Sequence, residues 1–429
     1  FKQVDPIFDN VPTFCIDHHY SHILSAWPMV PMDKVDVGVG IDGTGDNQLK
    51  MSIISNPGSL SSQVTYSTKN RTFGYLMTFI GNLMQLKGNT LDYPGKIMGL
   101  QAYGTVDYDY VKAINCKEIG ETLADLVGKI PWRGMVPLDI PNFFKFENRS
   151  FCDWLATIHY VVECYVLELF KQYCHPAQHI VYSGGCAQNT VYNHKLQQIY
   201  PNLMIPPHCY DGGQSLGCLE FLRMYYSEPR FSAEGFPYWQ ADCEREEPDQ
   251  AVIQRVVELL TEGKIVGWFQ GRGEIGPRAL GHRSILMDCR SADAKDILNN
   301  KVKHREIWRP FAPSILESKA SQWFDMDQPS PYMLRAVYVH EKKKDLIPAV
   351  VHVDGTSRVQ TVADQGVHCQ DPFLTLLTEF HRQTGVPMLL NTSLNAGGSP
   401  IFAERAQCID LFNTVAMDAM CMGNELLVK

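Results

Sequence analysis

Short apolar runs alternate with amphipathic segments along the whole chain, and Gly-rich turns join them. The stretch at 180–189 shows the pattern, because a short apolar strand leads into a tight turn and then into a helix. A chain that alternates strands and helices in this way buries both by packing helices against a sheet. We therefore predict an α/β fold for both halves of the 429 residues.

Apolar spacing and capping residues place the individual elements. A helix is predicted at 14–27 with Asp17 as its N-cap, and a hairpin at 35–54 turns at 42–46. Further helices are predicted at 73–85, at 151–173, from 211 onward and at 251–262, and a buried strand at 265–269.

The composition of the chain changes between 226 and 248, where three prolines accompany a run of Glu and Arg. Prolines and charges without apolar periodicity are typical of a linker. We therefore expect one domain at 1–228, a linker at 229–248 and a second domain at 249–429. The length of the chain agrees with two domains, each large enough to bury its own core.

The charge and the cysteines exclude several classes of protein. A net charge of −9 argues against nucleic acid as a partner, and no apolar run approaches the ~18–20 residues that span a bilayer. The 13 cysteines form no C-x-x-C pair, which argues against a zinc ribbon and a secreted disulfide framework. We expect a cytoplasmic enzyme without a membrane partner. The sequence leaves open whether the chain forms a homodimer.

A metal centre is predicted in the first half. His18 and His22 are four residues apart on the predicted helix, so both imidazoles lie on one face. Asp42 lies in a Gly-rich turn that also holds Asp46, and Asp211 precedes a Gly-Gly helix start. Two imidazoles with one or two carboxylates suit Fe²⁺ or another divalent metal. The alternatives are a structural His pair, an Asx turn and a helix N-cap.

Three Gly-rich turns in the same half also favour a nucleotide cleft. Gly184, Gly185 and Gly212 allow a close approach of the backbone, and helix N-termini attract anions. Each turn taken singly is also explained as a simple reversal of the chain.

Basic residues gather in the second half of this acidic protein. The segment 271–283 holds three arginines and four glycines, and 301–309 adds two lysines and two arginines. Such cations repel one another without an anion, so we predict a pocket for several phosphates rather than a solvated basic face. Because no P-loop and no G-x-S-x-G motif occurs, the chemistry is expected to rely on positioning and electrostatics.

Taken together, these motifs resemble the nodulation-protein-U and cephalosporin- or tobramycin-type O-carbamoyltransferases. The resemblance covers almost the whole chain, from 17–22 to 422–427. Its most specific stretches are YPGKIMGL at 93–100, SGGCAQN at 183–189, 271–285, KHREIWRPF at 303–311 and PMLLNTSLN at 387–395. The resemblance implies an actin-like ATPase (ASKHA) domain, similar to the tRNA threonylcarbamoyl-transfer enzyme, followed by a YrdC-like domain.

In that family the YrdC-like domain makes carbamoyl-adenylate from carbamoyl phosphate and ATP with Mg²⁺. The first domain then transfers the carbamoyl group to a hydroxyl of a small-molecule acceptor, near a bound iron. The resemblance implies iron ligands at His18, His22, Asp42 and Asp211. It implies catalytic residues at Lys303, Arg305, Ser393 and Asn395. By their position in the same Gly-rich turn, Asp42 and Asp46 are alternative candidates for accepting the proton of the acceptor hydroxyl. The implied phosphate- and nucleotide-binding residues are Arg278, Arg283, Arg309, Arg358, Lys301, Asn391, Gly184, Gly185, Asn189 and Gly212.

One departure from the family pattern leaves two alternatives. The family begins with a strand and a Gly-containing hairpin well before the helix predicted at 14–27, and we expect this hairpin to be missing here. A non-catalytic nucleotide- and metal-binding fragment is therefore one alternative. The other is a threonylcarbamoyl-type tRNA-modifying enzyme, which the acidic balance disfavours.

Overall fold

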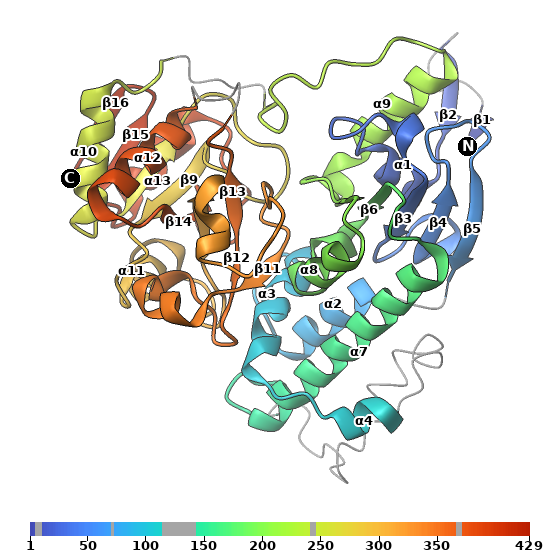
Figure 1. Cartoon of the computed structure of the whole chain (residues 1–429), viewed down its shortest axis with the longest axis horizontal. Coiled ribbons are helices and arrows are strands. Elements are labelled where there is room, and N and C mark those ends of the chain that lie inside the picture. The colour runs from blue at the N-terminus through green and yellow to red at the C-terminus, as the bar shows by residue number, and fades with distance from the viewer. Residues whose placement is uncertain (5–10, 70–72, 114–142, 241–245, 366–370) are drawn as a thin grey trace. The chain divides into compact units, whose positions relative to one another are not determined.

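The chain divides into two compact units, Phe1–Glu234 and Gly235–Lys429 (Figure 1). The point of division lies inside the range 229–248, where the sequence predicts a linker. The computed structural model describes residues 1–4, 11–69, 73–113, 143–240, 246–365 and 371–429. Within these ranges no helix has the length and apolar character needed to cross a membrane.

The first unit is built on a mixed sheet of five strands, which are β3 (Val37–Ile41), β4 (Met51–Ser55), β5 (Gln63–Thr68), β6 (Ile180–Ser183) and β7 (Leu203–Met204). Their order is β5-β4-β3-β6-β7. The central strand β3 is antiparallel to β4 and parallel to β6. The carboxyl ends of β3 and β6 therefore lie at the same edge, where ligands bind in open α/β sheets.

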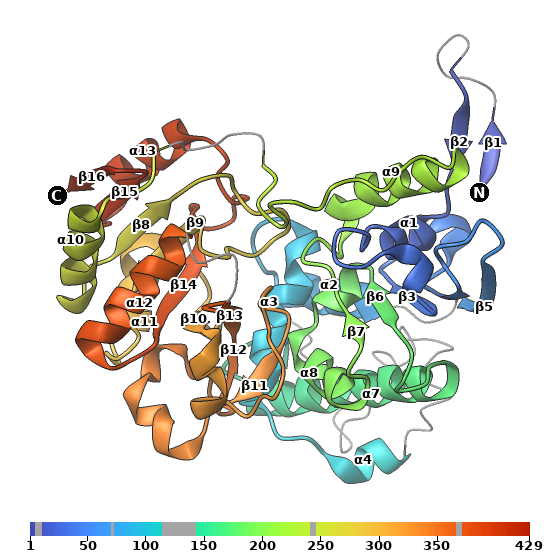
Figure 2. The same ribbon diagram turned by 45° about the horizontal axis from the view of Figure 1, so that its top comes forward.

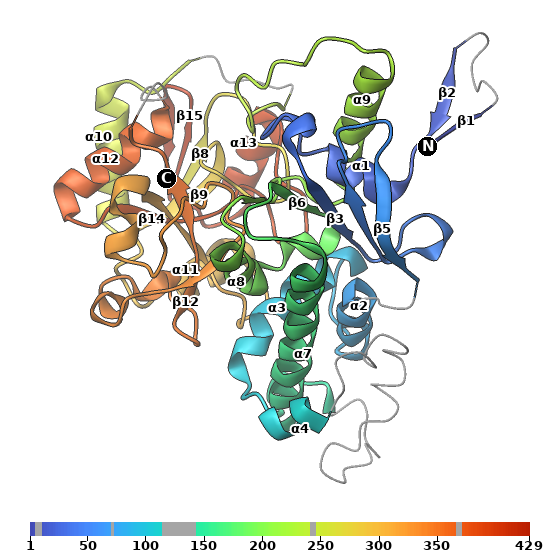
Figure 3. The same ribbon diagram turned by 45° about the vertical axis from the view of Figure 1, so that its right-hand side comes forward.

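Helices cover both faces of this sheet. On one face, Ile23 of α1 (His18–Leu24) packs in a cluster with Val181 of β6. Figure 3 shows α1 beside α9 (Gln214–Tyr225), with which it makes extensive contact. On the other face, the ring of Phe170 from α7 (Arg149–Tyr173) lies 5.4 Å from the ring of Tyr182. Consecutive strand residues point to opposite faces, so α1 and α7 sandwich the sheet. The remaining described helices of this unit are α2 (Phe73–Leu83), α3 (Tyr93–Leu100), α4 (Tyr108–Ala113) and α8 (Thr190–Ile199).

The helix predicted at 14–27 is shorter than expected. Asp17 caps α1 as predicted, because its Oδ1 accepts a hydrogen bond from the Tyr20 N–H at 3.0 Å. Phe14, however, lies in β2 (Thr13–Cys15), which pairs antiparallel with β1 (Lys2–Val4). Phe14 and Trp27 both pack against the apolar cluster of α1, although neither belongs to this helix.

The second unit holds a mixed sheet of order β13-β10-β14-β9-β8-β15-β16. Its strands are β8 (Val266–Phe269), β9 (Arg283–Met287), β10 (Ala312–Leu316), β13 (Gln360–Val362), β14 (Met388–Ser393), β15 (Ala419–Met422) and β16 (Glu425–Val428). Helices α10 (Gln250–Thr261) and α12 (Pro372–Thr384) contact each other and this sheet (Figure 2). Further described elements of this unit include α11 (Ala294–Leu298), the π-helical turn η7 (Asn299–Lys303), α13 (Arg405–Thr414) and the pair β11 (Ala336–Tyr338) and β12 (Thr356–Arg358).

The α/β class predicted for both halves is confirmed. The hairpin predicted at 35–54 is formed by β3 and β4, which pair antiparallel around the turn at 42–46. The helices predicted at 73–85, 151–173 and 251–262 correspond to α2, α7 and α10.

Candidate functional site

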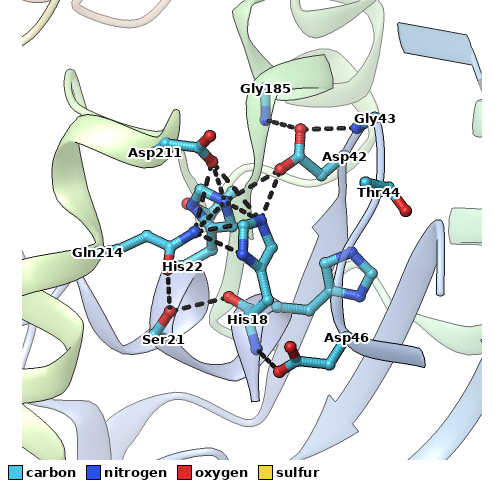
Figure 4. Close-up of polar contacts among 12 residues, drawn as sticks. His18, Ser21, His22, Asp42, Gly43, Thr44, Asp46, Gly185, Asp211 and Gln214 are labelled. Atoms are coloured by element: carbon cyan, nitrogen blue, oxygen red, sulfur yellow. Dashed lines mark hydrogen bonds and ion pairs between the residues drawn. The ribbon is translucent and has the colours of Figure 1, made fainter. Parts of the chain in front are cut away.

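Four side chains of the first unit meet at the carboxyl edge of its sheet (Figure 4). His18 and His22 come from α1, Asp42 directly follows β3, and Asp211 lies in the turn before α9. Their candidate ligand atoms all lie within 4.8 Å of one another. The Asp42 Oδ2 atom is 2.9 Å from His18 Nε2 and 3.2 Å from His22 Nε2. The Asp211 Oδ1 atom is 3.2 Å from His22 Nε2.

The spacing of these atoms fits the first shell of a small divalent ion. Metal–nitrogen and metal–oxygen bonds of about 2.1 Å place neighbouring ligand atoms about 3.0 Å apart in an octahedron and about 3.4 Å apart in a tetrahedron. The two histidine Nε2 atoms are 3.2 Å apart, and His18 Nε2 is 3.5 Å from Asp211 Oδ1. Two imidazoles and two carboxylates are donors that Fe²⁺, Mn²⁺ or Zn²⁺ accepts. The residues therefore fit a divalent metal.

The negative charge of the two carboxylates also favours a cation. Burial raises the pKa of Asp42, but hydrogen bonds to His18 and His22 outweigh burial and hold this pKa far below its usual value. The hydrogen bond with His22 likewise lowers the pKa of Asp211. Burial lowers the pKa of His22, yet the two carboxylates raise it above its usual value overall. Both aspartates are thus anionic at neutral pH.

Backbone amides hold Asp42 in its orientation. Its Oδ1 accepts hydrogen bonds from the Gly43 N–H at 2.7 Å and from the Gly185 N–H at 3.2 Å, which leaves Oδ2 to face the histidines. The turn after β6 approaches this closely because Gly184 has a φ of +95° and no side chain. A Cβ atom at Gly184 would lie 2.2 Å from the Ile41 carbonyl oxygen. Gly184 and Gly185 thus join the two strand ends at the metal site.

Asp46 and His19 lie beside the candidate ligands but make structural hydrogen bonds instead. The Asp46 Oδ2 atom accepts a hydrogen bond from the backbone N–H of His18 at 2.9 Å, so Asp46 supports the first turn of α1. The His19 ring is fully buried and its Nδ1 lies 2.9 Å from the Ser52 hydroxyl. Burial lowers the pKa of His19 to about 4, so this ring is neutral at physiological pH.

Sequence reasoning did not find Gln214, which belongs to the same site (Figure 4). Its amide nitrogen lies 3.3 Å from Asp211 Oδ1 and 3.1 Å from His18 Nε2. A signal was present, because residues three apart at the start of a helix lie on the same side. Gln214 stands three positions after Asp211.

A second group of predicted residues meets in the second unit. The Lys303 Nζ donates to the Ser393 carbonyl oxygen at 2.7 Å and to Asn395 Oδ1 at 2.6 Å. Lys303 ends the π-helical turn η7, and Ser393 ends β14. Burial lowers the pKa of Lys303 well below its usual value, and the nearby Arg305 and Arg309 lower it further.

Arg305 and Arg309 lie near this lysine, and together with Arg278 and Arg358 they form a group of mutually repelling arginines. Burial and then Arg309 lower the pKa of Arg305 to about 9. Burial lowers the pKa of Arg358 well below its usual value, and Arg278, Arg305 and Arg309 add to the shift. Among the residues that the structure describes, the buried Nε atoms of Arg305 and Arg358 have no hydrogen-bond acceptor. We call Lys303, Arg278, Arg305, Arg309 and Arg358 the basic cluster. Cations held this close together are stabilised by a bound anion.

Two residues predicted to bind nucleotide are engaged inside the fold. The buried guanidinium of Arg283 donates to the carbonyl oxygens of Gln270 at 2.6 Å and Gly271 at 3.0 Å. The buried Asn391 amide donates to the Ser314 hydroxyl at 2.8 Å. Both side chains therefore stabilise the second unit itself.

The other predicted residues lie in turns or at helix ends. Asn189 caps α8 by accepting a hydrogen bond from the Val191 N–H at 3.2 Å. Its amide nitrogen lies 2.9 Å from His159 Nε2. Gly212 is exposed in the turn before α9, and Lys301 is exposed on η7.

Comparison with known proteins yields two family models and several relatives. The carbamoyltransferase N-terminus model matches residues 7–219, and the carbamoyltransferase C-terminus model matches residues 257–429. Nodulation protein NolNO of Sinorhizobium fredii is 31% identical over 96% of this chain, which spans 64% of the length of NolNO. Nodulation protein NolO of Bradyrhizobium diazoefficiens is 29% identical over 96% of the chain and 79% of its own length. Nodulation protein U of Azorhizobium caulinodans is 31% identical over 74% of the chain and 60% of its own length.

Proposed function

This chain belongs to the carbamoyltransferase family, and from that premise we propose that it is an ATP-dependent O-carbamoyltransferase. The second unit forms carbamoyl-adenylate, and the first unit passes the carbamoyl group to a hydroxyl of a small-molecule acceptor. We assign an actin-like ATPase fold to the first unit and a YrdC-like fold to the second. The presence of a separate mixed sheet and a separate charged site in each unit supports this division.

The observation that carries this proposal is the basic cluster. Burial, and after it the neighbouring arginines, lowers the pKa of Lys303, Arg305 and Arg358, so the protein without a ligand holds these cations at close quarters. A polyanion relieves this repulsion, and ATP together with an acyl phosphate supplies several negative charges. The same cations stabilise the pyrophosphate that departs when a nucleotide is adenylated.

The residues of the second unit suit the adenylation step. Water first converts carbamoyl phosphate to carbamate and phosphate. A carbamate oxygen then bonds to the α-phosphorus of ATP, and the bond to pyrophosphate breaks. The cluster binds the phosphates of ATP·Mg²⁺, while Ser393 and Asn395 orient the Lys303 ammonium through the hydrogen bonds at its Nζ.

The residues of the first unit suit the transfer step. His18, His22, Asp42 and Asp211 would hold a divalent ion, which we assign as Fe²⁺. Such an ion supplies a Lewis acid for the carbamoyl oxygen. The Gly43 and Gly185 amides keep the Asp42 carboxylate in its place within this donor set. In the transfer, the acceptor hydroxyl oxygen bonds to the carbamoyl carbon, the bond to AMP breaks and AMP leaves, and the hydroxyl proton passes to solvent.

The first experiment measures pyrophosphate release from ATP, Mg²⁺ and carbamoyl phosphate without an acceptor. We expect release that requires carbamoyl phosphate. The rate should fall about 10²- to 10³-fold in Lys303→Ala, because a charged group that stabilises the leaving pyrophosphate is lost. Lys342→Ala, which removes an exposed lysine of the same unit, should leave the rate unchanged.

Two results would contradict the proposal. ATP binding without any pyrophosphate release favours the non-catalytic nucleotide-binding alternative. Binding of bulk tRNA at physiological salt favours the tRNA-modifying alternative, because this acidic chain has no other reason to bind RNA.

A further inference from the structure

We propose that Asn299 is a positioning residue of the basic cluster. Its side-chain amide holds the turn that follows it in a conformation that directs Lys303 and Arg305 to the same anion. The inference rests on the anion-binding role proposed above for this cluster. Asn299 directly follows α11 and begins the π-helical turn η7, which ends at Lys303. Such π-helical turns are rare and are often found at functional sites.

The side-chain amide of Asn299 pairs with both backbone groups of Arg305. Its Oδ1 accepts a hydrogen bond from the Arg305 N–H at 3.2 Å, and its Nδ2 donates to the Arg305 carbonyl oxygen at 2.9 Å. An N–H group needs an acceptor and a carbonyl oxygen needs a donor, so these two contacts fix the orientation of the amide. The Asn299 carbonyl oxygen also accepts a hydrogen bond from the His304 N–H at 2.7 Å. Asn299 therefore closes the turn with its backbone and its side chain together.

His304 has a left-handed backbone conformation at the end of this turn. Its φ is +46° and its ψ is +42°. Residues with a side chain rarely adopt this conformation, so the surrounding contacts must hold it. The side chain of His304 is exposed. The three hydrogen bonds from Asn299 to the backbone of His304 and Arg305 supply the restraint.

The left-handed residue decides where the side chains on either side of it point. Residues two positions apart on an α-helix lie about 200° apart around its axis and face opposite sides. Here Lys303 and Arg305 both reach the basic cluster. Burial lowers the pKa of Lys303 and the charge of Arg305 lowers it further, so the two cations lie near each other. A regular helix through His304 would turn one of them away from the anion.

The test is a calorimetric titration of the metal-free full chain with inorganic pyrophosphate. We expect Asn299→Ala to weaken binding roughly tenfold or more, because a displaced cation loses most of its contact with the anion. The number of sites per chain should stay the same, whereas a general loss of folding would lower that number. Asn300→Ala, which changes the exposed neighbour of the same residue type, is the matched control and should alter neither quantity.

A second variant tests the conformation of residue 304. Glycine adopts the left-handed conformation without a steric penalty. Adding His304→Gly to Asn299→Ala should therefore restore part of the lost affinity for pyrophosphate.

The outcomes separate this role from the proposed function. Unchanged affinity in Asn299→Ala, with or without fewer sites, overturns the positioning role, and so does a double variant that binds no more tightly than Asn299→Ala. A wild-type chain that binds pyrophosphate but releases none from ATP and carbamoyl phosphate contradicts the adenylation step and leaves the role of Asn299 standing. A wild-type chain that does not bind pyrophosphate overturns the anion site and this role with it.

Discussion

Asp42 and Asp46 belong to one turn, yet they do different things. Asp42 faces two imidazoles with one oxygen and two backbone amides with the other. Asp46 accepts a hydrogen bond from the first N–H of α1. The first arrangement suits the binding of a cation, and the second stabilises a helix end.

Exchanging each aspartate for asparagine should separate these two tasks. Asp42→Asn removes the charge that faces His18 and His22, so we expect Co²⁺ affinity to fall about 100-fold, measured by calorimetric titration. Asp46→Asn retains an acceptor for the His18 N–H and should lower the free energy of unfolding by no more than about 1 kcal/mol, with metal affinity preserved. If only the Asp46 variant lost metal binding, Asp46 and not Asp42 would be the ligand, and the prediction would be wrong.

At the scale of elements, the contact between α1 and α9 sets the geometry of the candidate metal centre. Both histidines lie on α1, while Asp211 and Gln214 lie at the start of α9. The helices approach closely at Gly217, where a Cβ atom would lie 1.8 Å from the Ser21 carbonyl oxygen. A glycine at this position therefore allows ligands from both helices to reach one ion.

Gly217→Ala should push the two helices apart. We expect a loss of about 1–3 kcal/mol in the free energy of unfolding, measured by chemical denaturation, together with weaker Co²⁺ binding. Gly95→Ala in α3 is the matched control, since nothing lies within 4 Å of its added Cβ atom. That variant should gain about 0.5–1 kcal/mol, because alanine favours a helix over glycine. Equal behaviour of the two variants would contradict the close approach.

For the whole molecule, two units with separate sites predict two separable losses of function. His22→Ala should abolish metal binding and leave pyrophosphate release unchanged, because His22 lies in the first unit. Lys303→Ala should lower the rate of pyrophosphate release about 10²- to 10³-fold and leave the metal content unchanged, because Lys303 lies in the second unit. The measurements are metal bound per chain and the rate of pyrophosphate release. Simultaneous loss of both in either folded variant would refute this division of labour.

The sequence predicted elements correctly where they depend on interactions between residues close together in the chain. The N-cap at Asp17 and the hairpin around 42–46 were predictable because both depend on residues close together in the chain. The helix predicted at 14–27 was too long because Phe14 pairs as a strand with residues near the N-terminus. The spacing of apolar residues within 14–27 carries no information about this pairing with another segment.

For the candidate sites, the sequence alone determined which residues are chemically suitable. The spacing of His18 and His22 placed both imidazoles on one helix face, and the density of arginines indicated an anion site. Tertiary structure decided which suitable residues meet. It brought Asp42 rather than Asp46 to the histidines, added Gln214 and buried Arg283 among backbone carbonyls. The physical reason is that ligand atoms must lie about 3 Å apart, and only the close contacts between strand ends and helices bring distant residues to that separation.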